Sequence, residues 1–83
     1  MNKNNTEIQN IADQILLACA TSLERFKQAK TEEEKQMIAV TEFMTGITQT
    51  VDFIIRNNGT ITSRQIRDAM DIVSKELGVW IIC

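Results

Sequence analysis

The strongest constraint on the fold is the spacing of apolar residues between positions 31 and 57. They recur at alternating intervals of three and four residues, at Met37, Val40, Met44, Ile47, Val51 and Ile54. An α-helix places residues with this spacing on one side. The sequence therefore predicts one long helix over 31–57, with this row of side chains as its packing seam.

The apolar side of this helix is wider than the seam. Ala39, Phe43, Gly46 and Phe53 widen it on one flank, and Ile55 widens it on the other. At about 100° per residue the apolar arc covers roughly 200°, which predicts contact with two neighbouring helices or with a second copy. A glycine inside a helix costs about 1 kcal/mol relative to alanine, so we expect another helix to approach closely at Gly46.

Capping patterns mark the helix boundaries. A threonine followed three positions later by Glu or Gln predicts helix starts at Thr6, Thr31 and Thr62. The Asn-Asn-Gly sequence at 57–59 favours a turn, and Gly78 suits the residue after a last helical turn. The predicted helices cover 6–28, 31–57 and 62–77.

The length and composition of the chain favour an all-α fold. The 83 residues include no proline and three glycines, which is typical of long helices joined by short turns. We expect a single domain over 1–83, a three-helix bundle in which the long helix is central and an apolar tail follows. A chain this short buries only about 60% of its unfolded surface, so a homodimer is favoured.

The apolar tail over 79–83 predicts a contact, because exposed apolar residues at a chain end favour aggregation. The tail packs either on its own bundle or on a partner, and the sequence leaves both alternatives open. Leu17 points away from the apolar face of the first helix, and tryptophan is common among binding hot spots. The candidate partner-binding residues are Leu17, Ile72, Val79, Trp80 and Ile82.

Catalytic and metal-binding patterns are missing from the sequence. There is no histidine and no tyrosine, and the serines have no evident activating partner. Cys19 and Cys83 match no metal-ligand spacing, and a glycine-rich phosphate loop is absent. We therefore expect neither an enzyme nor a bound cofactor or metal.

Charge and hydropathy argue against two other partner classes. The net charge of −2 does not suit a nucleic-acid-binding protein, which usually carries a basic stripe. The longest uninterrupted apolar run, over 15–20, is six residues long, so no membrane span is expected. The first ten residues contain no apolar signal core, and a cytoplasmic location is expected.

The stretch from Asn58 to Ile66 resembles the second half of an EF-hand loop and the start of its exit helix. Aligned on Gly59, the EF-hand ligand positions are occupied by Ile54, Arg56 and Gln65, so we do not expect calcium to bind. The part from Thr60 onward is also similar to the loop before the third helix of the histone fold. Histone-fold chains are basic, whereas this chain is acidic, and no binding residues are carried over.

The sequence favours a small protein–protein interaction module, of adaptor, inhibitor or co-chaperone type, that binds through its surface without catalysis. Its size suits a regulatory protein of a bacterium or phage, and its partner is another protein or a second copy. The alternative is a helical protein that binds or sequesters a small ligand or nucleotide between protomers. Its candidate ligand-binding residues are Thr41, Thr45, Thr48 and Arg56.

Overall fold

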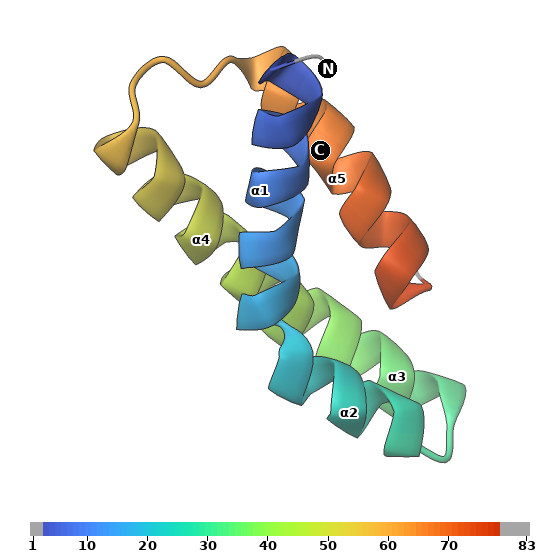
Figure 1. Ribbon diagram of the computed structural model, residues 1–83. Coiled ribbons are helices and arrows are strands. Elements are labelled where there is room, and N and C mark those ends of the chain that lie inside the picture. The colour runs from blue at the N-terminus through green and yellow to red at the C-terminus, as the bar shows by residue number, and fades with distance from the viewer. Residues whose placement is uncertain (1–2, 79–83) are drawn as a thin grey trace.

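The computed structural model describes residues 3–78 and is all-α, with no strand in that range (Figure 1). The chain begins with α1 (Lys3–Ala18) and α2 (Ala20–Gln28). A 26-residue central helix, Glu32–Asn57, then runs through α3 (Glu32–Ile38), the π-helical turn η1 (Ala39–Phe43) and α4 (Met44–Asn57). The last described helix is α5 (Ser63–Leu77).

The caps at the second and third predicted helix starts are confirmed. The Thr31 hydroxyl accepts a hydrogen bond from the Glu34 backbone N–H at 3.1 Å. Thr62 and Gln65 form both bonds of a capping box, at 3.2 and 2.9 Å. Gly78 ends α5 with φ 75°, a conformation that glycine adopts without a Cβ clash.

The predicted helix start at Thr6 is wrong. Residues from Lys3 onward are already helical, so Thr6 lies inside α1. Ordinary residues differ in helix propensity by less than about 0.7 kcal/mol each. The polar residues before Thr6 can therefore be helical, so that the helix begins before the capping residue.

The helix predicted over 6–28 is divided at Cys19. This residue has φ −97° and ψ 2°, outside helical values. Its N–H still bonds the Ile15 carbonyl at 3.0 Å, and its carbonyl accepts from the Leu23 N–H at 2.8 Å. The chain therefore changes direction over a single residue, so that α1 and α2 pack against different neighbours.

The central helix contains one residue more than regular α-geometry would place in the same turn. The Met44 N–H bonds the Ala39 carbonyl, five residues earlier, as in a π-helix. Consequently Ile38 and Phe43 are both buried although they are five residues apart, at 8% and 0% exposure.

The π turn corrects the predicted packing seam. A regular helix would align the whole row, but the extra residue offsets the two halves of the helix. Ile47 and Ile54 are buried and Val51 is half-buried, as the seam predicts. Met37 and Val40, on the other side of the offset, are exposed instead, by 65% and 61%. Met44 lies in the same half as Ile47 and Ile54 and is 38% exposed at the border of their buried side.

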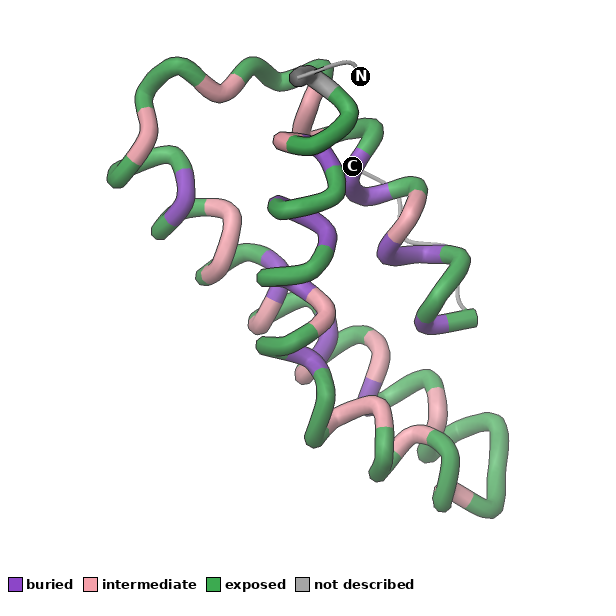
Figure 2. The backbone as a smooth tube through the Cα atoms, in the orientation of Figure 1, coloured by how far each residue is buried: buried purple, intermediate pink, exposed green. Residues whose placement is uncertain are grey.

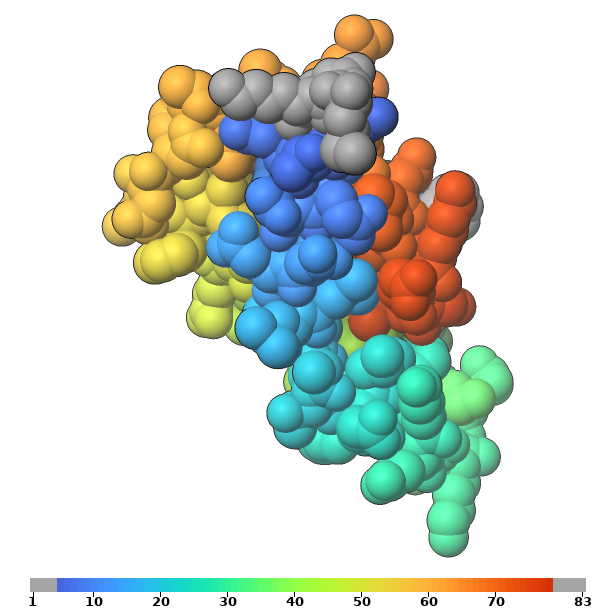
Figure 3. All heavy atoms as spheres, viewed as in Figure 1, coloured from blue at the N-terminus to red at the C-terminus, as the bar shows by residue number. Residues whose placement is uncertain are grey.

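Within the described residues, α1 is the element that joins the others. It packs against both α4 and α5, which make little direct backbone contact with each other, while α2 packs along α3 and η1 (Figure 1). Buried positions follow the inner sides of α1, α4 and α5 (Figure 2). Seen as spheres, α1 lies between α4 and α5 and continues into α2 (Figure 3).

The close helix approach predicted at Gly46 is confirmed. A Cβ atom at this position would lie 3.4 Å from the Cys19 Sγ and 3.8 Å from the Ala18 carbonyl oxygen. The glycine therefore faces the junction between α1 and α2. Both distances are ordinary van der Waals separations, so the site has room for one methyl group.

Candidate interaction surface

The most distinctive surface of the described residues is the apolar part of the central helix. Five of the six large apolar side chains that are exposed lie on this helix, and the sixth is Leu17 of α1. The five on the central helix are Met37, Val40, Met44, Phe53 and Ile55.

Four residues form a continuous row along one flank, which we call the apolar strip: Val40, Met44, Val51 and Ile55. At about 100° per residue, the last three fall within an arc of roughly 40°. Val40 is four residues before Met44, across the π turn. Val40, Met44 and Ile55 are exposed and Val51 is half-buried, so α1 and α5 leave the row open.

The surroundings of the apolar strip carry little charge. Between positions 37 and 55 the charged residues are Glu42 and Asp52. Asp52 is paired with Arg56 at 3.1 Å, one turn further along the helix. Exposed threonines separate the apolar residues, and the Thr41 hydroxyl donates to the Met37 carbonyl at 2.6 Å within the same helix. The surface is therefore apolar with a neutral polar border.

Glu42 points away from the apolar strip and links η1 to α2. Its carboxylate accepts from the Ser22 hydroxyl at 3.1 Å and pairs with Arg25 at 2.6 Å. Next to it, the rings of Phe26 and Phe43 lie 5.4 Å apart. These contacts hold α2 on the π turn, which is a structural role for the carboxylate.

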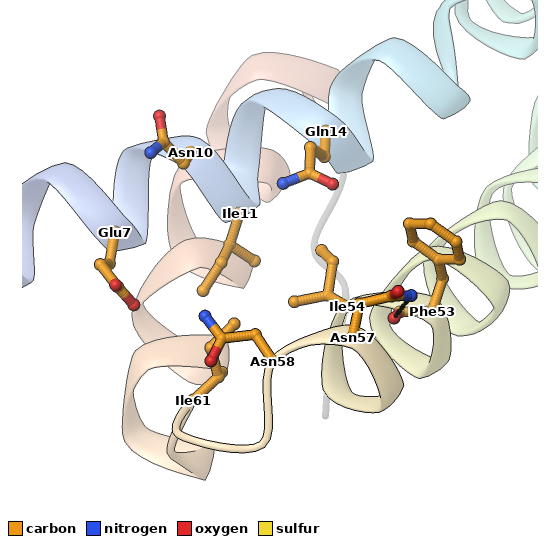
Figure 4. Close-up of a pocket in the computed structure, with 9 residues that line it drawn as sticks. All are labelled: Glu7, Asn10, Ile11, Gln14, Phe53, Ile54, Asn57, Asn58 and Ile61. Atoms are coloured by element: carbon orange, nitrogen blue, oxygen red, sulfur yellow. Dashed lines mark hydrogen bonds between the residues drawn. The ribbon is translucent and has the colours of Figure 1, made fainter.

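A hollow of about 190 Å³ lies between α1 and the end of α4 (Figure 4). Apolar side chains and polar groups, mostly amides, line it, and Phe53 borders it on α4. Its volume is below the roughly 300 Å³ at which ligand pockets usually begin. The other lining residues are Glu7, Asn10, Ile11, Gln14, Ile54, Asn57, Asn58 and Ile61.

The amides at the α4 end of this hollow already have partners. The Asn57 side-chain amide donates to the Phe53 carbonyl at 2.8 Å. The Asn58 side-chain oxygen accepts from both the N–H and the hydroxyl of Thr60, at 3.2 and 2.6 Å. These groups shape the turn into α5, and the hollow offers one carboxylate, Glu7, with no base or nucleophile beside it.

The predicted partner-binding residues are separated in the structure. Leu17 is 78% exposed on α1, as predicted, whereas Ile72 is half-buried on α5 and packs against the core. Val79, Trp80 and Ile82 lie outside the described residues. The apolar strip was missed because Val40, Met44 and Val51 were predicted to lie in a buried seam, with Ile55 on its flank. No local sequence signal marks the π turn.

The predicted ligand-binding residues are spread along the central helix and do not all line one hollow. Thr45 and Thr48 border an open hollow together with Met44 and Gln49. Thr41 is exposed one turn earlier. Arg56 lies about two turns beyond this hollow and forms an ion pair with Asp52.

Reactive groups are sparse in the described part of the chain. No group of three or more metal-ligating side chains gathers there. Cys19 is fully buried, and burial raises the pKa of its thiol, which lowers its reactivity. By length and composition the central helix could span a membrane, and 22% of the apolar window that meets this test is buried within the described chain.

The described residues therefore expose an apolar helix face, and no cluster of reactive side chains lies beside it. No protein-family model, no curated protein and no solved structure matches this chain.

Proposed function

We propose that this protein is a small protein–protein interaction module, of adaptor, inhibitor or co-chaperone type, that acts by surface binding without catalysis. The observation that carries the proposal is the apolar strip. Isolated exposed apolar residues are common, but a contiguous exposed row favours an interface. Val40, Met44 and Ile55 are 61%, 38% and 45% exposed on one helix flank.

The strip has the composition of an interface centre with a polar border. Interfaces are depleted in charge at their centre and enriched in residues such as methionine. Met44 lies in the uncharged part of the strip, with Thr45 and Thr48 beside it. An ion pair between Asp52 and Arg56 lies at one end of the strip. A helix that presents apolar residues at intervals of four and seven suits binding to another helix or to a groove.

The same proposal includes the architecture expected of the whole chain. Counting α1 and α2 as one bent helix, the chain forms a three-helix bundle that dimerises, in the cytoplasm and without a nucleic-acid or calcium ligand. The packing of α1 against both α4 and α5 supports the bundle. The apolar residues after Gly78 are proposed as a further contact, made in cis or in trans.

Affinity capture with the tagged full-length chain tests the proposed function. We expect associated protein, whether copies of this chain or another protein, to be lost when Ile55→Glu places a charge in the strip. The control Asp71→Glu changes an exposed residue of α5 and should leave recovery unchanged. A chain truncated after Gly78 should show lower recovery and lower melting temperature. Absence of any associated chain, or equal recovery with Ile55→Glu, contradicts the proposal.

One observation favours the second candidate function, a small-ligand or nucleotide-binding protein. The open hollow bordered by Thr45 and Thr48 lies beside the strip, so a partner seated there would enclose it. Thermal-shift measurements with nucleotides and small metabolites test this candidate. A ligand at about 100 times its Kd adds about 2.7 kcal/mol of stability, which gives a clear rise in melting temperature.

A further inference from the structure

We infer that the apolar segment 79–83, which lies outside the described residues, folds back from Gly78 and packs in cis between α4 and α5. It contacts Val51 of α4 and the buried side of α5. The inference rests on the part of the proposed function that assigns this segment a contact, and it decides between cis and trans. It makes Val79, Trp80 and Ile82 packing residues of their own chain.

The buried side of α5 is wider than one neighbouring helix covers. Among the described helices, α5 makes its main backbone contacts with α1. Its first and last buried residues round the helix are five positions apart, so the buried side spans about 140°, against about 100° for an ordinary core-facing stripe. Part of this side therefore lies against something other than α1. Five residues of α5 are at most 3% exposed: Ala69, Met70, Val73, Ser74 and Leu77.

Val51 gives the same indication from α4. Gly46 faces the junction between α1 and α2, and Val51 lies about 140° round the regular helix from it. Val51 is nonetheless half-buried and packs against the core. Among the described elements, α4 and α5 make little direct backbone contact and lie on different sides of α1 (Figure 1). The side chains between them therefore require further cover.

The segment 79–83 has the composition to supply that cover. Its sequence is Val-Trp-Ile-Ile-Cys, so burying it removes no charged side chain from water. The other residues outside the described range are Met1 and Asn2, which are too few to cover two helices. The occupant inferred from the described helices is therefore the chain's own C-terminal segment.

The end of α5 starts the segment in the required direction. Gly78 has φ 75°, and its N–H bonds the Ser74 carbonyl at 3.0 Å. Helix ends of this kind commonly pack the apolar residue after the glycine against the last turn, which here places Val79 near Val73. Five extended residues reach about 17 Å, the rise of roughly 11 helical residues. The segment can therefore run back along the whole buried side of α5 as far as Ala69.

Fluorescence of Trp80 tests the docking, because it is the only tryptophan of the chain. We expect the full-length chain to emit at a shorter wavelength than the urea-unfolded chain and to resist quenching by acrylamide. Both readings should stay unchanged on dilution, since the contact lies within one chain. Emission equal to that of the unfolded chain overturns the inference. Emission that moves to longer wavelength on dilution also overturns it, because the contact is then made in trans.

Nitroxide labels test where Trp80 lies, because a nitroxide quenches tryptophan emission only at close range. The background is Cys83→Ser, in which Cys19 is buried and stays unlabelled. A label on Met44→Cys lies on the same side of α4 as Val51 and should quench Trp80. The matched control is Leu17→Cys, which is more exposed but points outward from α1, and its label should leave the emission unchanged.

A mixing experiment separates cis from trans in the same samples. The labelled Met44→Cys chain is given Trp80→Phe as well, so that it carries the quencher but no tryptophan. Mixed with the unlabelled full-length chain, it should leave the emission of that chain unchanged. Quenching in this mixture shows that the segment docks on a second copy and overturns the inference. Equal emission from the Met44→Cys and Leu17→Cys labels overturns the inferred location.

Thermal melting tests the same contact without labels. Trp80→Ala should lower the melting temperature by at least about 10 °C, as expected for loss of a buried tryptophan, whereas Trp80→Phe should lower it much less. Leu17→Ala is the matched control on an exposed apolar residue and should leave it unchanged. A melting temperature of Trp80→Ala equal to that of the unmodified chain overturns the inference.

Failure of this inference and failure of the proposed function give different results. If Trp80 is undocked or docks in trans while Ile55→Glu still abolishes protein capture, the inference is wrong and the interaction module stands. If Trp80 is docked in cis but the full-length chain captures no protein, the inference stands and the proposed function is wrong.

Discussion

Deletion of Thr41 should leave the fold almost unchanged, because the π turn contains one residue more than a regular α-helix needs. Removing that residue lets the Ala39–Phe43 segment become α-helical, with Ile38 and Phe43 still on the same side. Thr41 is exposed, and its described hydrogen bond goes to Met37 of its own helix. The deletion therefore removes no described tertiary contact, and we expect the free energy of unfolding to change by less than about 1 kcal/mol.

Deletion of Gln49 is the matched control. Gln49 is also exposed, but it lies in the regular helix α4. Its removal rotates the preceding half of the central helix by about 100° relative to Ile54. Phe43 and Ile47, at 0% and 5% exposure, then turn out of the core. Loss of a buried phenylalanine costs about 3–5 kcal/mol and of a buried isoleucine about 1.5–3 kcal/mol, so this variant should be largely unfolded.

Urea denaturation followed by far-ultraviolet circular dichroism measures both variants. Chain concentration must be equal in all samples, since self-association would add to stability. If deletion of Thr41 destabilises the protein as much as deletion of Gln49, residues 39–43 form a regular α-helix. The joint burial of Ile38 and Phe43 would then be wrong, and with it the exposure of Val40.

Three further variants test local features by the same denaturation assay. Gly46→Ala should stabilise the fold by up to about 1 kcal/mol, because the added Cβ lies at van der Waals distance from Cys19; a loss of stability would mean that the helices pack more closely. Thr62→Ala should cost about 1 kcal/mol by removing the cap on the Gln65 N–H, whereas Thr60→Ala should cost less. Burial raises the pKa of the Cys19 thiol above its ordinary 9.0, so the folded state holds this proton more tightly than the unfolded state. Stability should therefore be complete below pH 9.0 and fall as the pH rises above it, and this fall should be smaller in Cys19→Ala.

Local hydrogen bonding made the helix boundaries predictable. The caps at Thr31 and Thr62 and the glycine at position 78 each depend on residues within one turn. Such patterns can be read from a few neighbouring residues. The predicted helix start at Thr6 was wrong, because a capping pattern favours a helix start but does not prevent the helix from beginning earlier.

The two irregularities in the helices were not predictable in the same way. Cys19 and the segment 39–43 contain no proline and no glycine, the usual signals of a break or a bend. Periodicity assumes a constant angle per residue, so a single extra residue misplaces every position on one side of it. For this reason Met37 and Val40 were expected in a packing seam but are exposed. Met44 lies in the same half of the helix as Ile47 and Ile54 and is exposed because it borders their buried side.

The candidate interaction surface was predictable only in part, because periodicity assumes a constant angle per residue. The exposure of Leu17 was predictable because the periodicity of one helix is enough to place it, and the structure confirms the exposure. The exposure of Val40 depends on how the two halves of the central helix are offset, which apolar spacing alone does not predict. The breadth of the apolar arc was nevertheless informative, since roughly 200° is wider than the stripe of about 100° on an ordinary surface helix.

The bend at Cys19 and the π turn together allow α1 and α2 to pack against the central helix. Cys19 lies against Gly46, while beyond the bend Arg25 and Ser22 of α2 hold Glu42 of the π turn. The bend directs α2 along the first half of the central helix, and the extra residue turns Ile38 inward there, on the same side as the buried Phe43. That rotation also leaves Met37 and Val40 facing outward. Exposure of Met37 and Val40 is therefore a geometric consequence of closing the core, so a variant that keeps the core intact should keep these two residues exposed as well.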